Sequence, residues 1–379
     1  MPTEPPLLFV PVGSNAARLF GMDARSRACR LAVNAGFECG DAVEAGRGMI
    51  IASLDYAWDP AWLKAIAAHP SSVLTLGGKP VLVHVPAGGP AAAPIADALA
   101  GTIAKGDMSA LERLRPIAAE TFEISHDEPR KRERPFVLPL DPADPAAVER
   151  AAYDASCKDV TDALTLYLWR RPGFYLTRWA ADAGLSPNMV TAVGAVLCVL
   201  ALWLFWGGHY WLGVVSGLVF MVLDTVDGKL ARCTGTSSKW GDGLDRGIDF
   251  IHPPLWWWAW IHGLGAYGRP LEPIYTIMLL WVIIGGYVAQ RLIEGLFIRR
   301  FGGMHIHMWQ PIDSQFRLVT ARRNPNMVIL VAALLFRRPD VGIELVALWT
   351  IVSVIFHAVR LAQASVKSEL GEPIVSWLA

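Results

Sequence analysis

The chain has 379 residues, and its 34 Lys and Arg balance its 34 Asp and Glu, so its formal net charge is zero. A balanced charge gives no long-range attraction to a polyanion, and we expect no nucleic acid among its partners. Hydrophobic residues make up 53% of the chain, and long apolar runs dominate after about Leu185. The length and this change in composition predict two domains.

Residues 1–156 show the pattern of an α/β domain. Short apolar runs that end at turn residues predict buried strands, and apolar residues at helical spacing predict helices between them. The expected strands are Leu7–Val12, Met49–Leu54, Val73–Leu76, Pro80–Val85 and Phe136–Leu140. The expected helices are Arg25–Ala35, Pro60–Ala68 and one that begins near Ala146, and the charged segment Ser125–Pro135 is expected to be a loop.

The N-terminus and the cysteines indicate a compartment. Leu7–Val12 is too short for the apolar part of a signal peptide, and no basic region precedes it. We therefore expect the α/β domain to stay on the cytoplasmic side. The five cysteines are scattered and form no CxxC pair, which is more typical of reduced thiols than of a disulfide framework.

Residues 157–185 and 186–379 differ in character from the first domain. In Lys158–Ala183, aromatic residues and leucines alternate with arginines, which predicts an amphipathic juxtamembrane helix; an ordinary linker helix is the alternative. The apolar runs beyond it predict an all-α domain with six transmembrane helices. The expected spans are Met189–Trp206, Tyr210–Leu223, Ile248–Leu264, Ile274–Ala289, the short Asn326–Phe336, and Val341–Ala358.

Basic residues predict the orientation of these spans. They concentrate in Arg291–Arg323, on the same side of the membrane as the α/β domain when the spans are counted. That side is therefore expected to be cytoplasmic, although Arg337 and Arg338 fall on the other side. The prediction is a multi-pass protein of a bacterial inner membrane.

Four aspartates stand where the second span ends and the third begins. Asp224 and Asp227 are three residues apart, and Asp245 and Asp249 are four apart, so each pair shares one face of a helix. Several carboxylates at membrane depth are costly unless a cation neutralises them. Oxygen ligands alone favour hard divalent ions, Mg²⁺ first and then Mn²⁺ or Ca²⁺.

Other residues around the aspartates suit a phosphate-bearing ligand. Gly228 and Gly241 leave room for a ligand close to the backbone, and Arg232 supplies a positive charge suited to phosphate. Carboxylate-bound metals with phosphate ligands are the ingredients of phosphoryl transfer. Aspartates that only cap helices or face water are the alternative, but this alternative does not account for the glycines and the arginine.

Together these residues resemble a family signature. The chain reads Asp224-Thr-Val-Asp227-Gly228-Lys-Leu-Ala231-Arg232, then eight residues, then Gly241-Asp-Gly-Leu-Asp245-Arg-Gly-Ile-Asp249. This pattern, DxxDGxxAR followed by GxxxDxxxD, resembles that of the CDP-alcohol phosphotransferases. The segment Ser186–Thr191 resembles the entry of that family into its first span. The resemblance implies six transmembrane helices, a two-metal site that faces the cytoplasm, and a homodimer.

The resemblance also implies roles for individual residues. Asp224, Asp227 and Asp245 would bind two ions of Mg²⁺ or Mn²⁺. Asp249 would complete the metal site and act as the general base on the acceptor hydroxyl, or serve only as a fourth ligand. The residues that would hold the CDP moiety are Gly228, Ala231, Arg232, Gly241 and Asn188. The acceptor oxygen would attack the β-phosphorus, and CMP would leave.

The acceptor site is less visible in the sequence. If the acceptor carries a phosphate, basic residues on the cytoplasmic side should bind it; the alternative is that they only follow the positive-inside rule. The candidates are Arg291, Arg317, Arg322, Arg323 and Lys239. His252, His305 and His307 do not stand at ligand spacing from acidic residues, and we interpret them as ordinary loop and interface histidines.

The α/β domain has a resemblance of its own. A buried strand, a glycine turn with Arg18, a helix and a later strand ending at Asp55 resemble the cytidylyltransferase domain of inositol-phosphate lipid synthases, a sugar-phosphate nucleotidyltransferase. That family has GxGxR with a downstream Pro-Lys, whereas this chain reads Gly13-Ser-Asn-Ala-Ala-Arg18. Fewer glycines allow less close approach to a triphosphate. We expect a degenerate, catalytically silent domain that serves in assembly or regulation; an active cytidylyltransferase using Arg18 and Asp55 is the alternative.

The sequence thus predicts a membrane enzyme of phospholipid biosynthesis. It would transfer a phosphatidyl group from a CDP-linked lipid such as CDP-diacylglycerol to a small hydroxyl acceptor, inositol phosphate by analogy, and release CMP. Alternatives are a CDP-inositol donor, an ion transporter or channel, and a non-catalytic scaffold. A channel would spread its acidic residues along the spans, and a scaffold would be expected to lose a signature aspartate; neither pattern is present.

Overall fold

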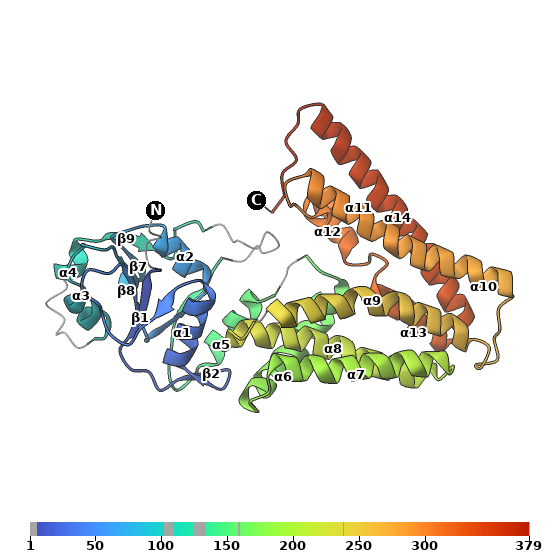
Figure 1. Cartoon of the computed structure of the whole chain (residues 1–379), viewed down its shortest axis with the longest axis horizontal. Helices are drawn as coiled ribbons and strands as arrows, with labels where there is room; N and C mark the ends of the chain where they lie inside the picture. The colour runs from blue at the N-terminus through green and yellow to red at the C-terminus, as the bar shows by residue number, and fades with distance from the viewer. Residues whose placement is uncertain (1–5, 102–108, 125–133, 158–159, 238, 379) are drawn as a thin grey trace.

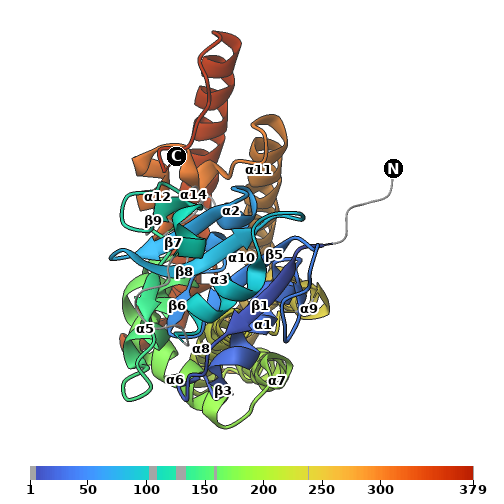
Figure 2. The same ribbon diagram turned by 90° about the vertical axis from the view of Figure 1, so that its left-hand side faces the viewer.

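The computed structural model describes residues 6–101, 109–124, 134–157, 160–237 and 239–378. It has an N-terminal α/β part and a helical C-terminal part, which lie end to end (Figure 1). Figure 2 shows the sheet of the α/β part in front of the helices. This confirms the predicted fold class at the level of an α/β domain followed by an all-α domain.

A six-stranded mixed sheet with the order β4-β1-β5-β8-β7-β9 forms the centre of the α/β part. Strand β1 pairs in parallel with β4 and β5, β8 pairs antiparallel with β5 and β7, and β9 is parallel to β7. The strands are β1 Leu8–Val12, β4 Glu38–Cys39, β5 Met49–Ser53, β7 Ser72–Leu76, β8 Lys79–Val85 and β9 Arg115–Ala118. Two small ribbons pair β6 Tyr56–Trp58 with β10 Val137–Pro139, and β2 Arg18–Leu19 with β3 Met22–Asp23.

Helices cover both faces of this sheet because successive strand residues point to opposite sides. Phe9 packs with residues of α1 and α2, whereas Leu8 and Val10 pack with residues of α3 and α4. The helices of this part are α1 Ala24–Asn34, α2 Ala61–Ala67, α3 Ala92–Leu99, α4 Ser109–Glu112 and α5 Ala146–Ala155. The predicted strands and helices are confirmed to within a few residues, while the predicted loop 125–135 lies largely outside the described residues.

One prediction about the cysteines is wrong. Cys29 on α1 and Cys39 on β4 form a disulfide, with a Cα–Cα distance of 5.6 Å. The two residues lie only ten positions apart, and the turn between α1 and β4 brings them together. Cys157, Cys198 and Cys233 are free thiols.

The juxtamembrane segment is helical, but it is not one regular helix. It begins with π-helical turns at Leu164–Trp169 and continues as α6, Arg170–Asp182. Tyr167, Tyr175 and Trp179 are exposed along it, as an amphipathic surface helix requires. Lys158, where the predicted helix began, lies outside the described residues.

The C-terminal part is a bundle of long helices. Among the described residues, four helical stretches are long and apolar enough to cross a membrane: Pro187–Trp206, Tyr210–Thr234, Pro273–Arg300 and Pro339–Glu369. They are α7, α8, the continuous stretch α10 (Pro273–Leu280) to α11 (Gly286–Arg300) with π-helical turns between, and α14. The other two predicted spans fall on α9, Lys239–Gly263, and on the shorter α13, Arg323–Leu335.

The two parts share a hydrophobic interface. Leu19 of the β2–β3 ribbon and its neighbours Ala17 and Phe20 are buried in one cluster with Phe174 of α6 and Leu230 of α8. The interface therefore lies against α8, the helix that carries the first half of the aspartate signature.

Candidate active site

Two adjoining cavities are lined by many, but not all, of the predicted site residues. One, of about 350 Å³, is bounded by α8, α9 and the segment before α6, and we term it the signature cavity. The other, of about 230 Å³, extends toward α11, and we term it the arginine cavity. Five residues line both cavities: Asp162, Asp249, Arg317, Arg322 and Arg323.

Helix α8 positions the first two aspartates. It runs without a break from Tyr210 to Thr234 and ends at Gly235, whose φ of 66° forms a left-handed C-cap. Asp227 is buried; its Oδ2 accepts a hydrogen bond from Thr191 Oγ1 at 2.6 Å, and its Oδ1 accepts one from the Gly228 amide at 2.6 Å. Thr191 on α7 thus fixes the orientation of an aspartate on α8.

Arg323 connects carboxylates from two different helices. Its Nη2 donates to Asp224 Oδ2 at 2.7 Å, and its Nη1 donates to Asp249 Oδ1 at 2.9 Å. The Arg323 side chain is 14% exposed, so little solvent screens this interaction. The guanidinium demonstrates that Asp224 and Asp249 converge on one point and can neutralise a cation there.

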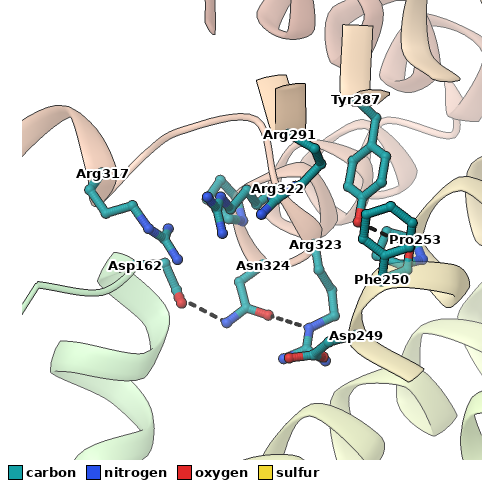
Figure 3. A pocket seen from close by; sticks show the side chains of 11 residues that line it. Asp162, Asp249, Phe250, Pro253, Tyr287, Arg291, Arg317, Arg322, Arg323 and Asn324 are labelled. Carbon is teal, nitrogen blue, oxygen red and sulfur yellow. Dashed lines mark hydrogen bonds and ion pairs between the residues drawn. The ribbon is translucent and has the colours of Figure 1, made fainter. Parts of the chain in front are cut away.

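Hydrogen bonds continue from Arg323 across the floor of the site (Figure 3). Arg323 Nε donates to Asn324 Oδ1 at 3.1 Å, and Asn324 Nδ2 donates to Asp162 Oδ1 at 2.8 Å. Burial raises the pKa of Asp162, but the Arg317 guanidinium and hydrogen bonds from Asn324 and Thr165 outweigh burial and hold this pKa below its usual value. Asp162 is therefore an anion that anchors α13 to the segment before α6.

Three arginines from α11, α12 (Pro311–Arg317) and the start of α13 surround the arginine cavity: Arg291, Arg317 and Arg322 (Figure 3). Glu294 holds two of them, because its Oε1 accepts from Arg322 at 2.5 Å and its Oε2 accepts from Arg291 at 3.2 Å. Burial, followed by repulsion from Arg322, lowers the pKa of Arg317 to about 9. With Arg323, four guanidinium groups line the cavity against the carboxylates of Asp162 and Asp249, and Glu294 lies behind two of them. The positive charge exceeds the negative charge by one, so the cavity suits an anion.

The prediction that His307 is an ordinary loop histidine is wrong. It is buried, and its Nε2 lies 3.3 Å from Glu294 Oε1; ligand atoms of Glu294, His307 and His357 lie within 4.8 Å of one another. Burial lowers the pKa of His307 well below its usual value despite the nearby Glu294 carboxylate. The Arg322 charge beside this cluster disfavours a metal cation there. His252 is buried against Phe220 and Trp256, as expected of an interface histidine.

Some of the remaining predicted site residues line these cavities and others do not. Gly228, Ala231 and Arg232 line the signature cavity, and a β-carbon at Gly228 would come within 3.3 Å of Arg232 Nη2. Asn188 is exposed on the first turn of α7 and does not line either cavity of the described part of the chain. Gly241 belongs to the first turn of α9. The side chains of Asp245 and Lys239 lie outside what the structure describes.

The described donors fit a hard divalent cation. Asp224, Asp227 and Asp249 offer only carboxylate oxygens, and they come from the two neighbouring helices that the signature predicted. Oxygen-only ligand sets suit Mg²⁺ and Mn²⁺. The fit is one of donor chemistry for all three aspartates, and of convergence on a single point, the Arg323 guanidinium, for Asp224 and Asp249.

Several residues of the site were not predicted. They are Thr191 as a partner of Asp227, Asp162, Asn324, Glu294 and His357. Each acts through a contact between distant segments, so local patterns say little about its role. Two signals were available: Thr191 ends the segment Ser186–Thr191, which resembles the family's entry into its first span, and Asn324 directly follows the candidate Arg323.

Comparison with known proteins finds relatives of the C-terminal part of the chain. A family model for CDP-alcohol phosphatidyltransferases matches residues 185–359. The archaetidylinositol phosphate synthase of Pyrococcus horikoshii is 28% identical over 194 residues, which are 50% of this chain and 89% of that protein. The phosphatidylinositol phosphate synthase of Mycolicibacterium smegmatis is 37% identical over 131 residues, 33% of this chain and 57% of that protein.

A solved structure of Mycobacterium tuberculosis phosphatidylinositol phosphate synthase with CDP-DAG bound is also similar. It is 19% identical, the TM-score is 0.38, and the similarity covers 50% of this chain and 94% of that one.

The four long apolar helices and the family match define an integral membrane protein, a transferase of substituted phosphate groups. The chain belongs, through its C-terminal part, to the CDP-alcohol phosphotransferase family. Members of this family use divalent metals such as Mg²⁺ or Mn²⁺.

Proposed function

We propose that this protein transfers a phosphatidyl group from CDP-diacylglycerol to inositol phosphate and releases CMP. The observation that carries the proposal is the position of Asp249, which lines both cavities. In the signature cavity, Asp249 lies with the signature residues, which suit a CDP-linked donor. In the arginine cavity, it lies with Arg291, Arg317 and Arg322, which suit a phosphorylated acceptor. The names of the two relatives, which are inositol phosphate lipid synthases, point to the same acceptor.

The signature aspartates would hold the metal. Asp224, Asp227, Asp245 and Asp249 would bind two ions of Mg²⁺ or Mn²⁺, in keeping with their oxygen-only chemistry. When bound, these ions supply positive charge that stabilises the diphosphate as negative charge develops on it. Arg232 would contact the donor phosphates, and the space beside Gly228 would admit them.

Asp249 and the arginines would act on the acceptor. The Asp249 side chain is 46% exposed, so it can receive the proton of an acceptor hydroxyl in the cavity. The acceptor oxygen then forms a bond to the β-phosphorus while the bond from that phosphorus to the CMP oxygen breaks. Arg291, Arg317 and Arg322 would bind the phosphate of the acceptor and orient its hydroxyl toward Asp249.

The test is CMP release by the purified full chain with Mg²⁺ and CDP-diacylglycerol. Inositol phosphate, inositol, glycerol phosphate and serine are compared as acceptors. We expect release that depends on inositol phosphate and is lost in Asp249→Asn. Arg322→Gln should raise the KM for inositol phosphate at least about tenfold and leave the KM for the donor unchanged, because a charge-assisted contact to phosphate is lost.

Other outcomes would change the assignment. Release with serine or inositol but not with inositol phosphate would refute the phosphorylated acceptor and leave the donor intact. Release of CMP only when CDP-inositol replaces CDP-diacylglycerol would show that the donor is CDP-inositol and not CDP-diacylglycerol. No release with either donor would contradict the proposed reaction.

The α/β domain is proposed to be catalytically silent, with a role in assembly. Support comes from the loop after Gly13, where Asn15 Nδ2 donates to the Leu54 carbonyl at 3.1 Å and to the Leu140 carbonyl at 2.9 Å. Phe20, a little further on, is buried against the membrane helices. In the same loop the Ala17 amide donates to Asn15 Oδ1 at 2.8 Å, so this amide is not free to bind a triphosphate. The homodimer, the domain boundaries and the cytoplasmic orientation stay predictions.

A further inference from the structure

A third cavity, of about 340 Å³, lies between the α/β part and the membrane part, and the proposed reaction does not use it. We term it the interdomain cavity. Its walls come from α1, α2, α5 and the C-terminal end of α8. Three cationic residues line it: Arg27, Lys64 and Arg232.

Arg27 is the most unusual residue of this cavity. It is 5% exposed, and its one hydrogen bond among the described residues joins Nε to the Cys233 carbonyl at 3.3 Å. No carboxylate of the described residues forms an ion pair with it within 4.0 Å. Burial lowers the pKa of Arg27, although Cys233, Asp59 and Glu149 oppose this effect. A buried guanidinium with one hydrogen bond to the protein lowers the stability of the fold unless an anion binds its other N–H groups.

The charge balance of the cavity also favours an anion. Asp59 is the one carboxylate among the described lining residues, against three cations. Asp59 is already engaged, because its Oδ1 accepts a hydrogen bond from the Ala61 amide at 2.9 Å at the start of α2. The wall also contains apolar surface from Leu31 and Phe136, on which a flat ring can pack.

We propose that the interdomain cavity binds a soluble nucleotide. Its phosphate would lie among Arg27, Lys64 and Arg232, and its base against Leu31 and Phe136. A soluble ligand is favoured over a lipid headgroup because α1, α2 and α5 of the α/β part form most of the wall, and α8 contributes only its C-terminal end.

The position of this cavity couples it to the signature cavity. Arg232 and Ser237 line both the interdomain cavity and the signature cavity. A nucleotide that binds the Arg232 guanidinium in the interdomain cavity therefore reduces the positive charge available to the donor phosphates in the signature cavity. Helix α1 also donates to the end of α8, through Arg27 to the Cys233 carbonyl and through Asn34 Nδ2 to the Gly235 carbonyl at 2.6 Å. The nucleotide would thus act on the donor site through the end of α8.

The experiment measures binding of radiolabelled CMP to the full chain in detergent, by equilibrium dialysis with EDTA present. EDTA removes the divalent ions on which donor binding at the signature cavity depends, so binding at the interdomain cavity is isolated. We expect one metal-independent CMP per chain. Lys64→Ala and Arg27→Gln should each weaken it about tenfold, through the loss of one charge-assisted contact. Lys79→Ala, on the exposed start of β8, is the matched control and should bind as the parent does.

The outcomes separate this proposal from the proposed reaction. Absence of metal-independent CMP binding up to millimolar concentration, or equal binding by Lys64→Ala, Arg27→Gln and the parent, would overturn the site. Displacement of CMP by an equal concentration of inorganic phosphate would overturn the assignment to a nucleotide. Asp249→Asn should bind CMP in EDTA as the parent does, so a failed transferase assay and a failed binding assay have different causes.

Discussion

Asp224 on α8 and Arg323 at the start of α13 form an ion pair at 2.7 Å although 99 residues separate them in the chain. The same guanidinium reaches Asp249 on α9 with its other nitrogen at 2.9 Å. Arg's planar fork permits this double contact, which a single ammonium group cannot reproduce. The pair ties the short helix α13 to the two helices of the signature.

Replacement of Arg323 should therefore impair the reaction strongly. In Arg323→Gln, Asp224 loses its charged partner, and we expect CMP release to fall at least about a hundredfold. Arg323→Lys keeps the charge but can bind only one carboxylate, so a loss of roughly tenfold is expected. Steady-state rates with saturating substrates measure both effects.

The control for these variants is Arg299→Gln, on the exposed last turn of α11, which should keep the parent rate. A rate for Arg323→Lys equal to that of the parent would show that the double contact is not needed.

The site could be predicted from the sequence only where its residues are local. Asp224 and Asp227 share one helical turn, so their spacing alone places them together. Arg291 and Glu294 also share a helical turn, but the contact of Glu294 with Arg322 gave no such signal, because 28 residues of chain separate the two. His307 was misread for the same reason: its acidic neighbour is on another helix. Side chains that meet through tertiary packing leave no periodic trace in a single sequence.

Thr191 should affect the metal rather than the chemistry. Thr191→Val keeps the shape of the side chain but removes the hydroxyl that donates to Asp227 at 2.6 Å. Groups that orient metal ligands typically contribute ten- to a hundredfold to metal affinity. We expect the Mg²⁺ concentration for half-maximal activity to rise about tenfold, with the rate at saturating Mg²⁺ nearly unchanged.

Thr350→Val is the matched control, since its hydroxyl donates only to the Val346 carbonyl of its own helix, at 2.8 Å. The same Mg²⁺ dependence in Thr191→Val and in the parent would remove Thr191 from the site.

The pH dependence of stability should involve His84 in the α/β part. Burial lowers the pKa of His84 from its usual 6.5, although hydrogen bonds to the Ile66 and His69 carbonyls oppose this. Below about pH 6.5 the unfolded chain therefore binds a proton that the folded chain resists, and stability falls as the pH falls. The slope from this one group is at most about 1.4 kcal/mol per pH unit.

Thermal unfolding between pH 7.5 and 5.5 measures this effect. His84→Gln removes the titration and keeps a donor for the Ile66 carbonyl, so its melting temperature should depend less on pH. Identical pH profiles of the variant and the parent would exclude His84 as a source of acid sensitivity.

The fold was more predictable than the site, because periodicity reports burial directly. The strand at Met49–Leu54 and the helix at Arg25–Ala35 are both found within one residue of their expected bounds. Strand β4 was missed because it has two residues, too few to show a pattern. The second span was expected to end at Leu223, but α8 continues to Thr234, because Val226, Leu230 and Cys233, at helical spacing, are buried in the interface with the α/β part.

Gly263 should be a sensitive position of the membrane part. A β-carbon there would overlap the Phe205 carbonyl oxygen and lie 2.9 Å from the Gly208 amide nitrogen, where the ends of α7 and α9 cross. Because both neighbours are backbone atoms, they cannot move aside as a flexible side chain would. We expect Gly263→Ala to lower the free energy of unfolding by about 1–3 kcal/mol, as overpacking of a core does. The melting temperature in detergent should fall by several degrees.

Gly265→Ala provides the comparison two residues later. The nearest atom to a β-carbon at Gly265 is the His262 carbonyl oxygen at 3.9 Å, an ordinary contact. This variant should melt within about one degree of the parent, because it introduces no overlap. Equal melting temperatures for Gly263→Ala and Gly265→Ala would contradict the close crossing of α7 and α9, whereas a drop confined to Gly263→Ala would locate it.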